Sequence, residues 1–240
     1  NAERRRVTPE DITEDLHTCL DRLGFEHIDL FVMHRDDPTV PVGPIVEVMN
    51  EHIASGRIGA YGGSNWAHER VGEANAYAAD NGLTGFAVSS PHFSLAEMVE
   101  EPWAECVSIA GPAGADARAW YADHDVALFC WSSLSRGFFS GQWTRRAMEA
   151  ATGEQANDIA VRCFRNEENL RRLDRCWQLA EARGWSVPQV ALAWVLNHPL
   201  DLYPLVGVCN GEQARQNAAM LDVELSPEEM DYLDRKRDSL

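Results

Sequence analysis

Short apolar runs alternate with longer amphipathic stretches along most of this 240-residue chain. The longer stretches repeat their apolar residues at helical spacing, while the short runs have the length and composition of buried strands. Five strands are predicted, at residues 28–33, 58–62, 85–89, 126–131 and 202–206. Helices are predicted at residues 9–23, 44–55, 68–81, 117–123, 166–183, 187–197 and 211–221, followed by a last helix that Ser226 caps.

The predicted strands are apolar on both faces, which is typical of a parallel sheet covered by helices. The fold class is therefore α/β. A parallel sheet of this repeat type closes into a barrel with eight strands, so five strands would leave two open edges. The sequence has no linker rich in proline, glycine or serine and no internal repeat, so we expect a single domain over residues 1–240.

The chain carries a formal net charge of −17. This charge argues against nucleic acid and anionic membranes as partners, because both would repel it. The six cysteines are scattered without a CxxC pair, and no histidine stands at zinc-finger spacing, so no metal site is expected. No run of about 18 apolar residues predicts a membrane helix. Together these features predict a soluble, cytoplasmic protein.

Polar residues directly follow the first two predicted strands. His34 comes after the first strand, and Ser64 and Asn65 come after the second. Ligands of α/β proteins bind at the carboxyl ends of strands, so these residues form a candidate site. Each signal is weak alone, because a lone histidine is more often structural and the Ser-Asn pair also suits a helix N-cap. The neighbouring pair Asp36 and Asp37 is interpreted as solvated or capping.

Two later turns suit phosphate. Residues 132–137 follow the most hydrophobic strand, and their small side chains and Arg136 could hold phosphate oxygens. Residues 207–211 lead into a helix, whose N-terminus offers unpaired amides and a positive dipole end. Neither signal is specific alone, and no GxGxxG, Walker or HExxH motif occurs. Residues 142–165 are predicted to form either a mobile lid over a cofactor or a disordered segment.

Five motifs in a fixed order carry a family resemblance. They are HRDDP, GRIGAYGGSNW, SSPHFSLAE, WSSLSRGFFSG and PLVGVCNGEQARQNAAML, each at the end of a predicted strand. With them the chain resembles the aldo-keto reductases over nearly all of residues 7–240. The resemblance implies a (β/α)8 TIM barrel, of which about five βα units are present in this chain. It also implies NADPH (NADP) or NADH (NAD) as the cofactor, and an oxidoreductase that reduces a small aldehyde or ketone to an alcohol by hydride transfer.

The resemblance assigns roles to the matching residues. His34 matches the catalytic histidine that hydrogen-bonds the substrate carbonyl. Ser64 and Asn65 match the pair that holds the nicotinamide carboxamide, and Ser90 stands where many members use glutamine. Trp131 matches the aromatic residue that stacks on the nicotinamide ring and fixes which face of it reacts. The positions that would wrap the pyrophosphate are Ser132, Leu134 and Gly137. The positions that would hold the adenosine end are Gly207, Gln213, Gln216 and Asn217.

The choice between NADPH and NADH stays open at this stage. Gln216 stands where the family usually has a glutamate, and Cys209 and Asn210 stand where a basic residue often meets the 2′-phosphate. Arg215 is the remaining charged candidate for that phosphate.

The family's catalytic aspartate, tyrosine and lysine come from strands before the histidine strand, and Asn1 falls after all of them. Carbonyl reduction needs a proton donor whose pKa a neighbouring cation lowers. We therefore expect an N-terminally incomplete barrel, and a 240-residue chain that is inactive alone. Three explanations stay open: part of a longer reductase, a domain of a fusion protein, or a truncated homologue. The truncated homologue would be a catalytically inactive nucleotide-binding or regulatory and interaction module, and its open sheet edges would allow a homo-oligomer.

Overall fold

The computed structural model describes residues 5–239, which fall into two compact units. The first unit contains the residues up to Pro91 together with Ala119–Leu128. The second contains His92–Arg118 and the residues from Phe129 onward. Each unit is described by itself below.

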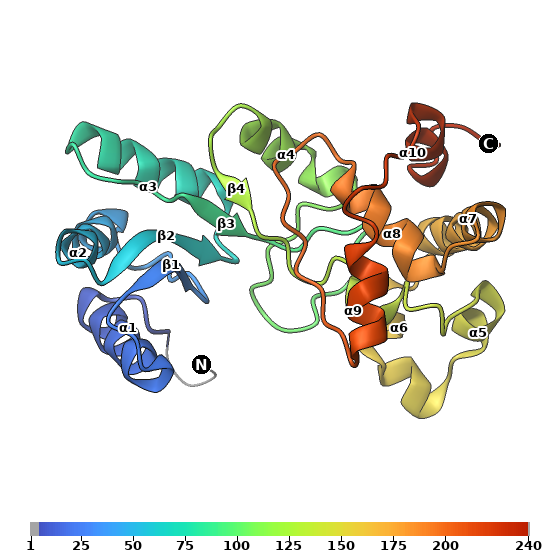
Figure 1. Ribbon diagram of the computed structural model, residues 1–240, viewed down its shortest axis with the longest axis horizontal. Helices are drawn as coiled ribbons and strands as arrows, with labels where there is room; N and C mark the ends of the chain where they lie inside the picture. Colours follow the sequence, from blue (N-terminus) through green and yellow to red (C-terminus); the bar gives the residue numbers. More distant parts are fainter. Residues whose placement is uncertain (1–4, 240) are drawn as a thin grey trace. The chain divides into compact units, whose positions relative to one another are not determined.

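The first unit contains a four-stranded parallel sheet in the order β1-β2-β3-β4 (Figure 1). Its strands are β1 (Ile28–Met33), β2 (Ile58–Ser64), β3 (Val88–Ser90) and β4 (Ala127–Leu128). Met33 pairs with Gly63, and Ser64 pairs with Ser90. Extending the first pairing by one residue brings His34 level with Ser64. Because parallel strands run in one direction, the register places the three predicted residues His34, Ser64 and Ser90 at the same level of the sheet.

The first unit contains the helices α1 (Pro9–Leu23), α2 (Val42–Ala54) and α3 (His68–Asp80), of which α1 begins and ends on clear sequence signals. The Thr8 side chain accepts a hydrogen bond from the Asp11 amide at the start of α1. Gly24, with a φ of 70°, ends this helix in the left-handed region. Helix α2 begins two residues before the predicted residue 44. The apolar faces of these helices and the sheet bury Ile12, Leu16, Ile45, Met49, Ile58 and Val71.

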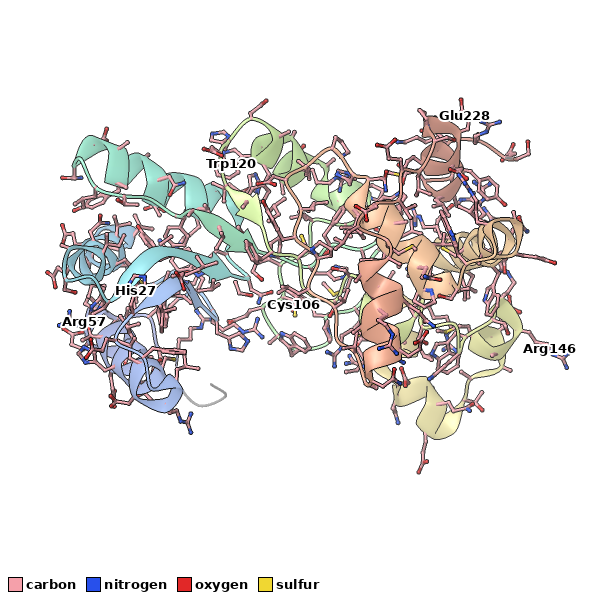
Figure 2. All side chains as sticks on the ribbon, in the orientation of Figure 1. His27, Arg57, Cys106, Trp120, Arg146 and Glu228 are labelled. Carbon is pink, nitrogen blue, oxygen red and sulfur yellow. The ribbon has the colours of Figure 1, made fainter. Side chains whose placement is uncertain are left out.

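Hydrogen bonds join the residues at the starts of β1 and β2. The predicted polar residues lie at the other, carboxyl ends of these strands. The Ile28 amide donates to the Arg57 carbonyl over 2.9 Å, and the His27 ring Nδ1 lies 2.7 Å from the Gly56 carbonyl. Figure 2 labels His27 and Arg57, which both lie beside the starts of these strands. Helix α4 (Ala115–Ala122) leads into the β4 segment.

The second unit is built mainly from short helices and irregular segments. Its helices are α5 (Arg145–Ala150), α6 (Ile159–Phe164), α7 (Glu167–Arg183), α8 (Val187–Leu196), α9 (Gly211–Ala218) and α10 (Pro227–Leu233). Three 3₁₀ turns, η1 (Pro112–Gly114), η2 (Ser135–Gly137) and η3 (Gly153–Asn157), connect other segments. The core includes Phe93, Ile109, Cys130, Phe138, Phe139, Phe164, Leu173 and Val190.

The predicted strand at 202–206 is not a regular strand in the structure. The segment does run beside Cys130, whose amide donates to Tyr203 over 3.1 Å and whose carbonyl accepts from Leu205 over 2.8 Å. These two bonds follow the pattern of a parallel ladder. Pro204 lies between the two bonded residues, so its nitrogen faces away from Cys130 and has no hydrogen to donate to a strand on that other side. The prediction of a fifth regular strand was wrong, although the segment keeps these two ladder bonds.

The predicted disorder of residues 142–165 was also wrong. This segment forms α5, η3 and α6, and it buries Met148, Cys163 and Phe164 completely. The Arg165 guanidinium donates to the carbonyls of Met148 and Ala151, both over 3.0 Å, and so joins the end of the segment to its middle. The segment is polar in composition, and its helices are only one or two turns long. They contain few apolar residues, but several of these residues are buried.

The described cysteines are all free thiols, and burial raises the pKa of the Cys130 and Cys176 thiols. None of the helices in the described part of the chain combines the length and the apolar character that crossing a bilayer needs.

Candidate functional site

The carboxyl ends of β2 and β3 bring three of the predicted site residues together. The Ser64 hydroxyl donates to the Ser90 carbonyl over 3.0 Å, and the Asn65 amide donates to the same oxygen over 3.1 Å. The Asn65 side-chain Nδ2 donates to the Ser64 hydroxyl oxygen over 3.1 Å. All three residues are at most 9% exposed. The strand ends therefore hold a hydroxyl and a carboxamide side chain in one fixed arrangement.

Asn65 adopts a left-handed backbone conformation with a φ of 58°. Asparagine enters this region more easily than most residues, because its short polar side chain can bond locally. Its bond to Ser64 is such a local contact. Positive φ values at non-glycine residues cluster at functional sites, and this one falls on a residue that the sequence had already singled out.

Two glycines before Ser64 allow the strands and the following tryptophan to approach closely. A Cβ atom on Gly62 would overlap the Val88 carbonyl oxygen of β3, and one on Gly63 would lie 2.5 Å from the Trp66 ring. Trp66, which follows Asn65 in the sequence, is fully buried and packs on Phe86, with ring centroids 4.9 Å apart. The Gly-Gly pair in the motif thus serves close packing, a role that the sequence analysis did not assign.

His34 follows β1 and its side chain is exposed. Partial desolvation, together with the positive charge of Arg35, lowers the pKa of His34 below its ordinary value of 6.5. The imidazole is therefore neutral at neutral pH. A neutral imidazole can donate one hydrogen bond through its protonated nitrogen, as hydrogen bonding to a carbonyl oxygen requires.

Arg70 of α3 fastens the loop that carries His34, and the sequence analysis missed it. Its guanidinium Nε lies 3.0 Å from an Asp36 carboxylate oxygen, and Nη2 donates to the carbonyls of Asp37 (3.2 Å) and Val40. The Arg70 and Asp36 side chains are 12% and 9% exposed. The same guanidinium lies over the Trp66 ring, 5.3 Å from its centroid.

The interpretation of Asp36 as a solvated or capping residue was therefore wrong, because its carboxylate is nearly buried against Arg70. Burial raises the pKa of Asp36, and the Arg70 charge opposes this rise. Asp37 does cap a turn: it accepts from the Thr39 amide over 3.0 Å and from the Thr39 hydroxyl over 2.7 Å. These bonds lower the pKa of Asp37. No sequence signal pairs Asp36 with Arg70, since 34 residues separate them.

In the second unit, Trp131 opens a backbone segment with several left-handed residues. Ser132 has a φ of 55°, and the run Ser135, Arg136 and Gly137 has φ values of 52°, 53° and 95°. The amides of Ser135 and Gly137 donate to the carbonyls of Ser132 (2.7 Å) and Leu134 (3.1 Å). The sequence predicted that exposed backbone amides in this turn would bind phosphate oxygens. Two of them are instead committed to the turn itself.

Two rings contact Trp131 in this unit. The His92 ring centroid lies 5.0 Å from that of Trp131, and the Trp103 centroid lies 5.3 Å from it. The Trp131 ring Nε1 is buried and has no hydrogen-bond partner. Arg136 places its guanidinium over the Trp103 ring, with its central carbon 5.6 Å from the centroid. Arg136 is thus engaged by an aromatic ring, although its side chain is exposed.

The residues predicted for the adenosine end lie at and near the start of α9. The Asn210 side chain caps the helix by accepting from the Gln213 amide over 2.9 Å, and Gln213 Oε1 accepts from the Cys209 amide over 2.7 Å. Gln216 donates to Glu212 over 3.0 Å, and the Arg215 guanidinium donates to Glu212 over 2.8 Å. Gly207 is exposed before the helix, and Asn217 is half-buried within it. The one cation suggested for a 2′-phosphate is therefore already paired with a carboxylate.

Four of the five tyrosine hydroxyls make hydrogen bonds within the structure. Those of Tyr61, Tyr77, Tyr121 and Tyr232 bond to Thr84, Glu47, Ser89 and Gln178. Burial raises the pKa of Tyr61, which is the opposite of what a proton donor to an alkoxide needs. Lys236 is the single lysine of the sequence, and its ammonium lies 2.8 Å from Asp234. These four hydroxyls thus bond to groups other than a lysine.

The family comparison agrees with the motifs. The model of the aldo/keto reductase family matches residues 2–238, and the chain belongs to this family. It is 29% identical over 223 residues to a versiconal hemiacetal acetate reductase of Aspergillus parasiticus, covering 93% of this chain and 61% of the relative. It is 27% identical over 235 residues to a probable voltage-gated potassium channel subunit beta of Oryza sativa subsp. japonica, covering 95% of this chain and 67% of the relative. The chain thus spans about two thirds or less of the length of these relatives.

A solved structure of similar fold is that of the thermostable aldo-keto reductase Tm1743. The TM-score is 0.66 at 18% sequence identity, and the match covers 96% of this chain and 67% of that one. This likeness confirms the predicted fold class, an α/β fold of the (β/α)8 TIM-barrel type. The comparisons give no support to the prediction of a missing N-terminal part. That prediction, the single-domain assignment and the roles of the site residues stay predictions.

Proposed function

We propose that this protein is an NAD(P)H-dependent oxidoreductase of the aldo-keto reductase type, which in the full barrel reduces an aldehyde or ketone to an alcohol. The observation that carries the proposal is the hydrogen-bonded group of Ser64, Asn65 and Ser90 at the carboxyl ends of β2 and β3. Ligand sites of this fold class are formed at these strand ends. Family membership supports the reaction type.

The Ser64 hydroxyl and the Asn65 amide fit a carboxamide ligand, because a carboxamide has both a donor and an acceptor. Bound there, the nicotinamide supplies the hydride that reaches the carbonyl carbon. His34 is proposed to hydrogen-bond the carbonyl oxygen of the substrate through its neutral imidazole, which its lowered pKa favours. In these roles the first unit orients the reacting groups.

The second unit is proposed to hold the rest of the cofactor. Trp131 offers an aromatic face to the nicotinamide ring. The pyrophosphate is assigned to Ser132, Leu134 and Gly137. The adenosine end is assigned to Gly207, Gln213, Gln216 and Asn217. Of these, Gln213 is bonded to the Cys209 amide and Gln216 to the Glu212 carboxylate. They would exchange these bonds for contacts with the adenosine.

The proposal includes a location and a choice of partners. The free thiols of the described cysteines favour a reducing compartment, and we propose the cytoplasm. The partner is a small carbonyl compound, and the acidic charge of the chain disfavours nucleic acid and membrane surfaces.

Cofactor binding and turnover test the proposal. The complete protein, expressed from its whole reading frame, is titrated with NADPH and NADH by tryptophan fluorescence and assayed with a panel of aldehydes and ketones. Saturable binding that Trp131→Ala weakens, together with carbonyl-dependent oxidation of the cofactor, supports a reductase. His34→Ala lowers turnover in that case, while Asn81→Ala, at the exposed end of α3, leaves turnover unchanged. A complete protein that binds neither cofactor would overturn the proposal.

A second function is favoured by the relative that is named a probable potassium channel subunit beta. The protein would then be a regulatory or interaction module that binds the nucleotide without turnover. The tyrosine contacts described above agree with this alternative, because the four hydroxyl bonds given there go to groups other than a lysine. Cofactor binding without reduction of any carbonyl in the panel would favour it over the reductase.

A further inference from the structure

His92 is a buried histidine that the proposed reaction does not use. It is fully buried, and its ring nitrogens are both engaged: Nδ1 lies 2.8 Å from the Ser108 hydroxyl, and Nε2 lies 3.1 Å from the Ser94 hydroxyl. Such a group is costly to bury unless each nitrogen finds a partner. Its surroundings show what these bonds hold in place.

The hydrogen-bond directions around Ser94 determine where the His92 proton lies. The Ser94 hydroxyl donates its one proton to the Ala96 carbonyl over 2.9 Å, so it must accept at its lone pairs. The His92 Nε2 is therefore the protonated nitrogen and donates to Ser94. The opposite nitrogen, Nδ1, accepts from the Ser108 hydroxyl. Burial lowers the pKa of His92 to about 3, so this neutral form is kept at physiological pH.

The second lone pair of Ser94 connects this histidine to the left-handed turn. The Ser135 hydroxyl donates to the Ser94 oxygen over 2.9 Å. Ser135 begins the run of left-handed residues, and its side chain is fully buried. The left-handed region is unfavourable for non-glycine residues, so the turn needs compensating contacts. The chain of bonds from Ser108 through His92 and Ser94 to Ser135 is such a contact.

His92 also contacts Trp131 directly. Their ring centroids are 5.0 Å apart with an interplanar angle of 50°, and their backbones form a parallel β-bridge. A second bridge joins His92 to Ser108, where the His92 amide donates to Val107 over 2.8 Å. His92 thus contacts Trp131 through its ring and its backbone. Its Nε2 proton is donated to Ser94, which also accepts from Ser135 of the left-handed turn.

We propose that His92 is the positioning residue that holds the Trp131 ring and the turn at Ser135–Gly137 in one fixed relation, so that the stacking face and the pyrophosphate turn are set before the cofactor arrives. The biological meaning of this inference rests on the proposed function, since both elements are assigned to the cofactor. His92 itself contacts only protein groups. Its role is to lower the ordering cost of binding, which is the usual benefit of preorganisation.

Amide hydrogen exchange and cofactor affinity, measured on the complete protein, test the proposal. His92→Phe keeps an aromatic ring beside Trp131 and loses both hydrogen bonds. We expect exchange of the amides at residues 134–138 to rise about tenfold, and affinity for NADH or NADPH to fall by about the same factor. His92→Gln can place an amide donor near the Nε2 position, so it should restore most of both losses. The control His124→Phe replaces an exposed histidine that stacks on Trp120, with ring centroids 4.0 Å apart, and should change neither. Figure 2 labels Trp120.

A milder pair of variants covers the case in which His92→Phe fails to fold. Ser94→Ala and Ser135→Ala each break the same bond from one side, so the two should raise exchange of the turn without adding in the double variant. Additive effects, or unchanged exchange in Ser135→Ala, would overturn the inference. Unchanged exchange and affinity in a folded His92→Phe would overturn it as well. If exchange rises as expected but the wild type binds no cofactor, the positioning role stands and the proposed function fails.

Discussion

The two units of this protein hold their predicted site residues by different physical means. In the first unit, regular parallel strands end in register, and the polar residues at their carboxyl ends lie at one level of the sheet. In the second unit, the corresponding residues lie on an irregular turn with left-handed backbone, which buried side chains hold. Backbone hydrogen bonds between strands are common to every sheet. A chain of serine and histidine side chains is particular to this sequence, so its contacts depend on individual side chains.

The largest effect is expected where the strands of the first unit approach most closely. Gly62→Ala would push a Cβ atom into the Val88 carbonyl of β3, so β2 and β3 must separate. We expect the free energy of unfolding to fall by about 3 kcal/mol, as for severe overpacking. Chemical denaturation measures this change. Gly207→Ala is the matched control, since a Cβ atom there meets nothing within 4 Å and should leave the stability unchanged.

A smaller effect is expected at Arg70, which fastens the His34 loop to α3. Arg70→Ala leaves the Asp36 carboxylate nearly buried without its partner, and we expect a loss of about 2 kcal/mol of unfolding free energy. Exchange of the amides at residues 35–40 should rise with it. Arg70→Lys, which keeps the charge but not the forked geometry, should recover only part of the loss. Equal stability of Arg70→Ala and the wild type would show that the loop is held by other contacts.

The buried histidine of the second unit predicts a pH dependence of stability. The pKa of His92 is about 3 in the folded chain and near 6.5 when unfolded, so the unfolded state binds the proton first as the pH falls. Stability is therefore lost below pH 6.5, by about 1.4 kcal/mol per pH unit until the folded pKa is approached. His198, with a pKa lowered to about 4 mainly by burial, acts in the same direction.

Comparing the wild type with His92→Phe isolates the contribution of His92 to this pH dependence of the unfolding free energy. Denaturation curves between pH 6 and pH 4 should show a slope smaller by one proton in the variant. Parallel slopes in the two proteins would contradict the neutral, buried state of His92.

The smallest effect is expected at the surface of α9. Glu212 pairs with Arg215, the cation that the sequence suggested for a 2′-phosphate, and both side chains are exposed. Glu212→Gln removes the competing charge, so the affinity for NADPH relative to NADH should rise about threefold at low salt. The ratio of the two dissociation constants measures this. An unchanged ratio would show that Arg215 does not meet the 2′-phosphate.

The sequence predicted most of the elements because their signals are local. Thr8 and Gly24 bound α1 as expected, and the strands before His34 and Ser64 lie where the apolar runs placed them. The segment at 202–206 makes two ladder bonds to Cys130 but forms no regular strand, and Pro204 has no amide hydrogen for a strand on its other side. Residues 142–165 were misjudged although Thr144 and Asp158 cap α5 and α6, because helices of six residues leave little periodicity to detect.

The side-chain contacts that hold the site residues in place could not be predicted from single sequence motifs. Ser135 and Ser94 are 41 residues apart, and Arg70 and Asp36 are 34 apart, so no local pattern pairs them. The strand ends could be predicted because the change from an apolar run to polar residues is a local signal. The hydrogen-bonded partners of a buried serine depend on the packed structure instead.

The most direct test of the central claim measures whether Ser64 and Asn65 contact the nicotinamide carboxamide. The complete protein and its Asn65→Ala variant are each titrated with NADH and with the reduced 3-acetylpyridine analogue, which has a methyl group in place of the carboxamide nitrogen. We expect the wild type to bind NADH about tenfold more tightly than the analogue, and the variant to bind both about equally. Equal discrimination by the wild type and the variant would contradict the assignment.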